Sequence, residues 1–256
     1  MNTGRTVLRW LVLAWVAACG GGCGRAGLDE PVHATLYEAA RAGDLADVQL
    51  HLRRGSFINS SFVGGETALM VAADNGHLAV VRHLLERGAG VNLVQLEGYS
   101  ALFFAAERGH LDVVRCLVEH GANVQAKGPA NYTPLLFAVE RGHLDVVRYL
   151  VEQGANLQER GAVNYTPLFF AVEQGHVDIV RYLVEQGIAV DARGDDSYTP
   201  LILAAERGQL GVVKYLVEQG ADLQATTSRR RNALDVARQR KHKPVVEYLS
   251  GVMANE

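Results

Sequence analysis

The chain has 256 residues, of which 48% are hydrophobic and 21% charged, and its formal net charge is −3 at pH 7. This composition is typical of a globular protein and excludes both a low-complexity chain and a bundle of membrane helices. The slightly negative charge provides no basic field for nucleic acid, and three cysteines are too few for a disulfide framework in a chain of this length.

Residues 1–18 predict a signal peptide. Arg5 and Arg9 give it a positive start, and an apolar run of nine residues follows over 10–18. A run of nine is too short to span a bilayer, which needs about 20 residues. We therefore expect export of the chain.

The apolar run closes with Val-Ala-Ala-Cys, whose last residue is Cys19. This resembles the lipobox of bacterial lipoproteins, in which small residues fit the signal peptidase and the cysteine thiol is acylated. The resemblance implies a lipid anchor on Cys19, and Gly20 after it implies the outer membrane, facing the periplasm. The alternative is an ordinary secretory signal cleaved after Ala18, with Cys19 incidental.

Residues 19–33 are rich in glycine, and Gly22, Gly24 and Gly27 match the spacing of a dinucleotide-binding loop. That loop needs a strand before it and a helix after it. Here the predicted signal peptide precedes the glycines and Leu-Asp-Glu-Pro follows them. We therefore interpret 19–33 as a flexible tether and expect no cofactor.

Residues 34–253 repeat with a period of 33. One set of glycines consists of Gly43, Gly76, Gly109, Gly142, Gly175 and Gly208. A second set consists of Gly55, Gly88, Gly121, Gly154, Gly187 and Gly220. A third set, of helix-capping residues, consists of Thr67, Ser100, Thr133, Thr166, Thr199 and Asn232. Three independent sets with one period indicate a repeat array.

The unit over 131–157 shows what each repeat forms. Thr133 suits the N-cap of a first helix and Pro134 its first position, while Gly142 supplies a left-handed residue at its end. A second helix begins near His143, with apolar residues at helical spacing. Two helices of this length cannot bury their own apolar faces, so the repeats must stack.

These units resemble the ankyrin repeat, whose period is also 33. The matching segments are Thr133-Pro134-Leu135, Gly142-His143-Leu144-Asp145-Val146-Val147 and Gly154-Ala155-Asn156. The resemblance extends from about Thr35 to Leu249. It implies an all-α solenoid of about seven helix-turn-helix repeats joined by short β-turn or hairpin loops, with the first and last repeats acting as caps.

The chain departs from the ankyrin pattern at one position. The histidine that usually follows Thr-Pro-Leu is replaced by apolar residues, which are Met70, Phe103, Leu136, Phe169 and Ile202. We therefore expect apolar packing in place of the usual polar contact.

The histidines invite a metal hypothesis, because His77, His110, His143 and His176 recur every 33 residues. Neighbouring copies in a solenoid lie about 10 Å apart, whereas the ligands of one zinc ion lie within about 2.1 Å of it. We therefore expect no metal site. No nucleophile–base pattern or phosphate loop is present in the sequence either, and we expect that the protein is not an enzyme.

In ankyrin proteins the turn tips and the ends of the first helices line a concave binding surface. The resemblance therefore implies a partner-binding strip made of Tyr99, Tyr132, Tyr165, Tyr198, Glu107, Arg108, Glu140, Arg141, Glu173, Gln174, Glu206 and Arg207. Tyrosine gives a large contact area at low entropic cost. The alternative is that the tyrosines only stack on one another as scaffold.

We thus expect a monomeric scaffold, exported and tethered to the membrane, that binds another protein and no nucleic acid. The alternative is a binder of a small envelope ligand such as a glycan fragment. The last unit carries basic residues at 229–231 and 238–243. They either cap the array with a polar face or dock an acidic headgroup or partner.

Overall fold

A computed structural model describes residues 30–161 and 164–254, and the folded unit begins at Val32. Fourteen α-helices and no β-strand occur in these residues, which confirms the expected all-α fold. The helices are α1 (Leu36–Ala42), α2 (Leu45–Arg53), α3 (Ala68–Asp74), α4 (Leu78–Glu86), α5 (Ala101–Arg108), α6 (Leu111–Glu119), α7 (Pro134–Arg141), α8 (Leu144–Glu152), α9 (Pro167–Gln174), α10 (Val177–Glu185), α11 (Pro200–Arg207), α12 (Leu210–Glu218), α13 (Ala233–Arg240) and α14 (Lys243–Met253). The predicted signal peptide and Cys19 lie outside the described residues.

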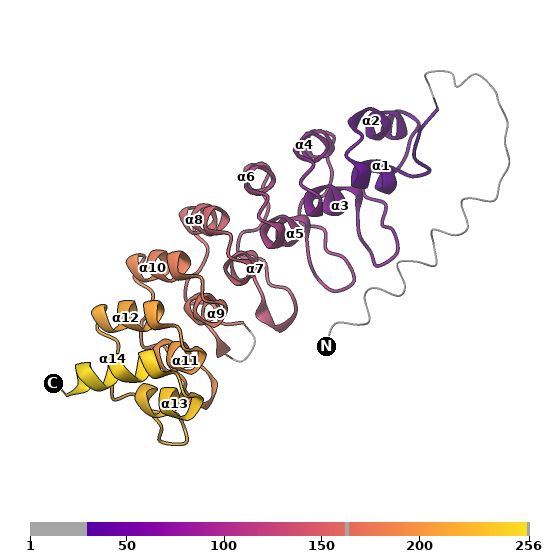
Figure 1. Ribbon diagram of the computed structural model, residues 1–256. Coiled ribbons are helices and arrows are strands. Elements are labelled where there is room, and N and C mark those ends of the chain that lie inside the picture. The colour runs from indigo at the N-terminus through magenta and orange to yellow at the C-terminus, as the bar shows by residue number, and fades with distance from the viewer. Residues whose placement is uncertain (1–29, 162–163, 255–256) are drawn as a thin grey trace. The chain divides into compact units, whose positions relative to one another are not determined.

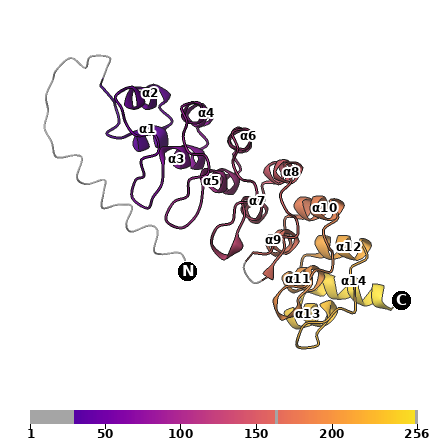
Figure 2. The same cartoon turned by 180° about the vertical axis from the view of Figure 1, so that it is seen from behind.

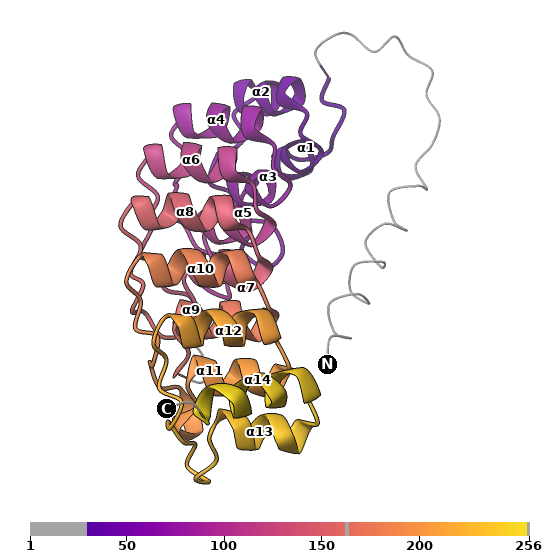
Figure 3. The ribbon, with the colours of Figure 1, turned by 60° about the vertical axis from the view of Figure 1, so that its left-hand side comes forward.

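The helices form two rows that run along the array (Figures 1 and 2). The odd-numbered helices make the inner row, from which the loops project, and the even-numbered helices make the outer row. Figure 3 shows α4 to α12 of the outer row lying side by side. Each helix packs on its counterparts in the neighbouring repeats and on its partner within the repeat. The array bends toward the side of the loops (Figure 1).

The predicted caps are confirmed in the repeat formed by α7 and α8. The hydroxyl of Thr133 accepts from the amide of Leu136 at 3.2 Å, and Pro134 is the first helical residue. Gly142 ends α7 in the left-handed region with φ 82°. The apolar residues that stand in place of the usual histidine, Leu136 among them, are all buried, so this position belongs to the core.

The recurring histidines tie each repeat to the one before it. The ring Nε2 of each donates to a carbonyl oxygen at the end of the preceding inner helix, and because a carbonyl only accepts, Nε2 must carry the proton. The bonds run from His77 to Arg41 (3.0 Å), His110 to Asp74 (3.2 Å), His143 to Glu107 (3.0 Å), His176 to Glu140 (3.2 Å) and His242 to Glu206 (2.9 Å). The spacing thus reflects a structural role.

The loops between repeats are compact turns, each closed by a bond from its first amide to the carbonyl four residues later. These bonds join Gln95 to Tyr99, Gly128 to Tyr132, Gly161 to Tyr165, Gly194 to Tyr198 and Thr227 to Arg231. Asn131 and Asn164 have φ of 57° and 59° in the position that Gly98 fills with φ 88°. Asparagine tolerates this region better than most residues, which explains its presence here.

The start of the array is held by a buried carboxylate, that of Asp47 in α2. Its oxygens accept from the amides of Val32 and His33 at 3.0 and 2.8 Å, and the His33 ring Nδ1 lies 2.9 Å away. His51, one turn along the helix, bonds the carbonyl of His33 at 2.9 Å. The sequence reading missed this cluster. Asp44 is also nearby, but it caps α2 through the amide of Asp47, so these oxygens already serve the fold.

Replacing Asp47 with asparagine should lower the free energy of unfolding by about 1–3 kcal/mol at neutral pH, because bonds to a charged acceptor are lost. Burial raises the pKa of Asp47, but the bonds from His33 and Val32 and the charge of His51 outweigh burial and leave it lowered. The stability from Asp47 is therefore present above about pH 4 and is lost as the pH falls further. Urea titrations from pH 7 to 3 should show the two proteins converging; a constant difference would contradict this.

The last repeat lacks the turn glycine, and Lys241 ends α13 in its place with φ 64°. The two-helix unit therefore tolerates the loss of this glycine at the end of the array. None of the described helices combines the length and apolar character needed to cross a membrane.

Candidate functional site

The twelve residues of the predicted partner-binding strip, here called the inner strip, lie along the inner row in two lines. The four tyrosines stand directly before the caps of α5, α7, α9 and α11, and the charged residues and Gln174 lie at the ends of these same helices. The two lines meet, because Tyr132 is hydrogen-bonded to Glu140 and Tyr198 to Glu206. The inner strip is thus one connected surface.

The tyrosine rings pack against phenylalanines of the inner helices. Tyr99 lies 5.5 Å from Phe137 and Tyr132 lies 5.4 Å from Phe170, between ring centroids, so rings of successive repeats interlock. Tyr165 stacks on Phe169 at 4.6 Å. All four tyrosines are half-buried. The rings therefore support the scaffold and keep part of their surface open to a partner.

Ion pairs link the ends of successive inner helices. Each joins an arginine of one repeat to an acidic residue of the repeat before it. The pairs are Arg108 with Asp74 (2.7 Å), Arg141 with Glu107 (2.5 Å), Arg207 with Glu173 (2.8 Å) and Arg240 with Glu206. Such exposed pairs contribute only about 0.2–1 kcal/mol each. Their main consequence is that they neutralise the carboxylates along the inner strip.

The series breaks at Glu140. The residue that would pair with it in the next repeat is Gln174, which has no charge, and Glu140 forms no ion pair with any described residue. Glu140 is half-buried. The middle of the inner strip therefore presents a carboxylate whose charge the fold leaves uncompensated.

The surroundings of Glu140 disfavour negative charge. Burial raises the pKa of Glu140, the charges of Glu107 and Glu173 raise it further, and Arg141 lowers it in part. Burial together with the charges of Glu140 and Glu173 raises the pKa of Tyr132 to about 12. A cation placed here would favour the ionised carboxylate.

The outer row carries a different series of contacts. Arginines lie over tyrosine rings of the next repeat, at 4.6 Å for Arg115 over Tyr149 and 4.8 Å for Arg148 over Tyr182. Cys116 takes the slot of these tyrosines in α6 and is buried. Arg148 is therefore exposed but not idle, which makes it a poor neutral control for binding experiments.

Apolar side chains are exposed on the loops before α3 and α5. Val63 and Leu96, which hold equivalent places at the two loop tips, are 76% and 86% exposed. The amide of Leu96 donates to the carbonyl of Gly64 at 3.0 Å, so the two tips lie side by side. Exposed apolar groups of this kind mark contact surfaces, and these extend the inner strip toward its N-terminal end.

The sequence reading found the tyrosines and most of the charges but missed Asp74, Arg240 and the phenylalanines between them. A simple signal could have found them, since each lies 33 residues from a residue already in the strip or from another phenylalanine. In the part of the chain that the structure describes, the inner strip combines half-exposed aromatic rings with alternating charges. Such a surface suits recognition.

Comparison with known proteins agrees with this architecture. Residues 36–128 and 125–194 match the family model described as ankyrin repeats (3 copies), and residues 183–237 match that of ankyrin repeats (many copies). The crystal structure of the human ASB11 ankyrin repeat domain is similar, with a TM-score of 0.74 and 31% identity, covering 83% of this chain and 98% of that one. A search of curated proteins gave no match.

Proposed function

This chain belongs to the ankyrin repeat family, whose domains generally mediate protein–protein interaction, and from that premise we propose that it is a scaffold whose inner strip binds a partner protein. The observation that carries the proposal is the uncompensated carboxylate of Glu140 at the middle of a half-exposed aromatic surface. A basic side chain of a partner would neutralise Glu140 and restore the missing pair.

The same surface favours a protein over a small ligand. A small-ligand site would hold a deep pocket between the tyrosines. Instead, Tyr99, Tyr132 and Tyr165 fill the space toward the helices by packing on phenylalanine rings. What remains open is a shallow strip along several repeats, which matches the area of a protein interface better than that of a compact ligand.

The proposal is tested by placing a photo-crosslinking amino acid at Gln174 of the full chain in intact cells. Gln174 is exposed on the inner strip, and Glu152 is an equally exposed residue of the outer row that serves as the control. We expect a protein crosslinked from 174 and absent from 152. The same product from both positions, or from 152 alone, would place the interface elsewhere.

We further propose that the scaffold is exported and anchored through a lipid on Cys19. The support is the Val-Ala-Ala-Cys sequence after a nine-residue apolar run. Replacing Cys19 with serine should release the protein from membranes or leave it unprocessed, because acyl chains contribute about 0.8 kcal/mol per buried CH₂. Membrane fractionation and the apparent mass on a gel check this. If the Cys19→Ser protein fractionates and migrates as the unmodified chain does, Cys19 carries no lipid.

A further inference from the structure

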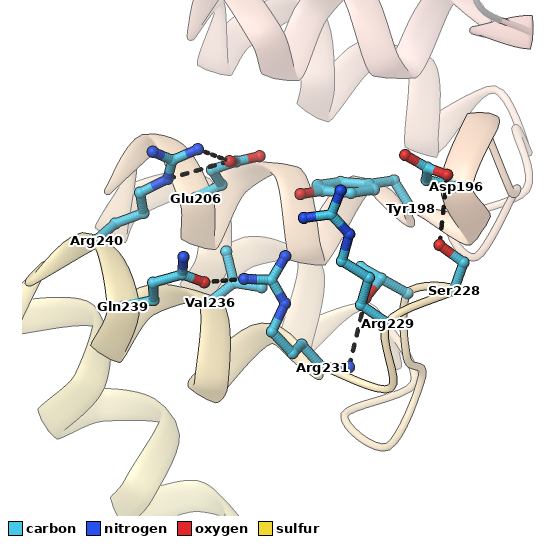
Figure 4. A pocket seen from close by; sticks show the side chains of 10 residues that line it. Asp196, Tyr198, Glu206, Ser228, Arg229, Arg231, Val236, Gln239 and Arg240 are labelled. Carbon is cyan, nitrogen blue, oxygen red and sulfur yellow. Dashed lines mark hydrogen bonds and ion pairs between the residues drawn. The ribbon is translucent and has the colours of Figure 1, made fainter.

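A cavity of about 190 Å³ lies at the C-terminal end of the inner strip, between the last two repeats. Its walls come from the loops before α11 and α13 and from these two helices (Figure 4). The charged residues that line it are Asp196, Glu206, Arg229, Arg231 and Arg240. The function proposed above makes no use of this cavity.

The cavity exists because the tyrosine series ends in an arginine. Arg231 stands 33 residues after Tyr198, so it occupies the position that a tyrosine holds in the four preceding repeats. Its loop keeps the same turn, with the amide of Thr227 donating to the carbonyl of Arg231 at 3.0 Å, and Arg230 has φ 57°. A cation thus replaces an aromatic ring at the last rung of the inner strip.

The positive charge of the cavity is not balanced within it. Arg240 pairs with Glu206, which also bonds Tyr198. Asp196 lies at the opposite end beside Ser228, whose hydroxyl donates to it at 3.3 Å (Figure 4). Arg229 and Arg231 form no ion pair within the described residues and lie in the middle of the view, below the Tyr198 ring (Figure 4).

Arg231 also has an unused hydrogen-bonding edge. Its Nη1 donates to the side-chain oxygen of Gln239, whereas its Nε is buried and bonds nothing. A guanidinium binds a carboxylate best through two parallel N–H groups, and the edge that carries Nε is the one that Gln239 leaves free. A polar cap needs only exposed charges such as Arg238 and Lys243, so capping does not explain Arg231.

We propose that this cavity binds a carboxylate side chain of the partner protein, held by Arg231 and by the second charge of Arg229. The inference rests on the proposed function, since it assigns a chemistry to one end of the same surface. Together with Glu140, it gives the inner strip a polarity, with a basic group of the partner at the middle and an acidic group at the C-terminal end.

The test uses the full chain and two small probes, N-acetylglutamate amide and its neutral match N-acetylglutamine amide. The Arg231 Nε–H signal and the amide signals of 227–231 are followed by NMR during titration. We expect saturable shifts with the glutamate probe and none with the glutamine probe. Arg231→Gln and Arg229→Gln should each weaken binding at least tenfold, and Arg238→Gln, an exposed change on the same helix, should leave it unaltered. Arg229 is itself exposed, so its variant keeps the test valid if Arg231→Gln fails to fold.

Equal shifts with both probes, or equal weakening by Arg238→Gln, would overturn the site. Binding of inorganic phosphate without binding of the glutamate probe would overturn the carboxylate assignment. In a pull-down with the crosslinked partner, Arg231→Gln should reduce capture at least tenfold. If it does not, while variants of Glu140 do, the inference fails and the proposed function stands; if neither reduces capture, the proposed function fails.

Discussion

Replacing Glu140 with glutamine should weaken binding of the partner about thirtyfold, which corresponds to about 2 kcal/mol for a central, desolvated contact. The variant should fold at least as stably as the parent. Burial and the neighbouring carboxylates raise the pKa of Glu140, so its ionised form costs stability at neutral pH, and this cost disappears with the charge. Calorimetric titration with the partner and thermal unfolding measure the two effects.

Replacing Gln174 with arginine should give the same loss of binding without touching Glu140. The new arginine would stand where Arg108, Arg141 and Arg207 stand in other repeats, and it would complete the ion-pair series. Stability should rise slightly, by less than about 1 kcal/mol. Glu152→Gln on the outer face of α8 is the matched control and should change neither quantity. Unaltered binding by the Gln174→Arg protein would show that no partner cation reaches Glu140.

Replacing Gly109 with alanine should lower the free energy of unfolding by about 3 kcal/mol, from a left-handed backbone together with a steric clash. Gly109 has φ 75°, and a Cβ there would lie 2.4 Å from Nδ1 of His143. The ring must move, which breaks its bond to the carbonyl of Glu107. Urea unfolding followed by circular dichroism should report this loss as an earlier midpoint.

Gly121 provides the control for this change. It has φ 87°, but nothing lies within 4 Å of an added Cβ. Gly121→Ala should therefore cost only the backbone strain, about 1–2 kcal/mol. The difference between the two variants measures the histidine contact, and it should shrink when His143 is also replaced with alanine. Equal losses at Gly109 and Gly121 would mean that the histidine ring does not contribute to the stacking of repeats.

The sequence by itself determined the repeat, its helices and its turns. Thr133, Pro134 and Gly142 act on backbone groups within a few residues of themselves, so their effect is local and can be read from residue type and spacing. The same holds for Asn131 and Asn164, whose positive φ follows from the turn in which they lie. Stacking followed because two short helices cannot bury their own apolar faces.

Only the tertiary structure decided which side chains of different repeats meet. The pairs between Glu107 and Arg141 and between Glu173 and Arg207 depend on how far one repeat is rotated and shifted on the next. The isolation of Glu140 and the free edge of Arg231 are properties of these pairings, not of either residue alone. A carboxylate and a guanidinium look alike in sequence whether they are paired or not. Their charge is available to a partner only where the packing of neighbouring repeats leaves it unbalanced.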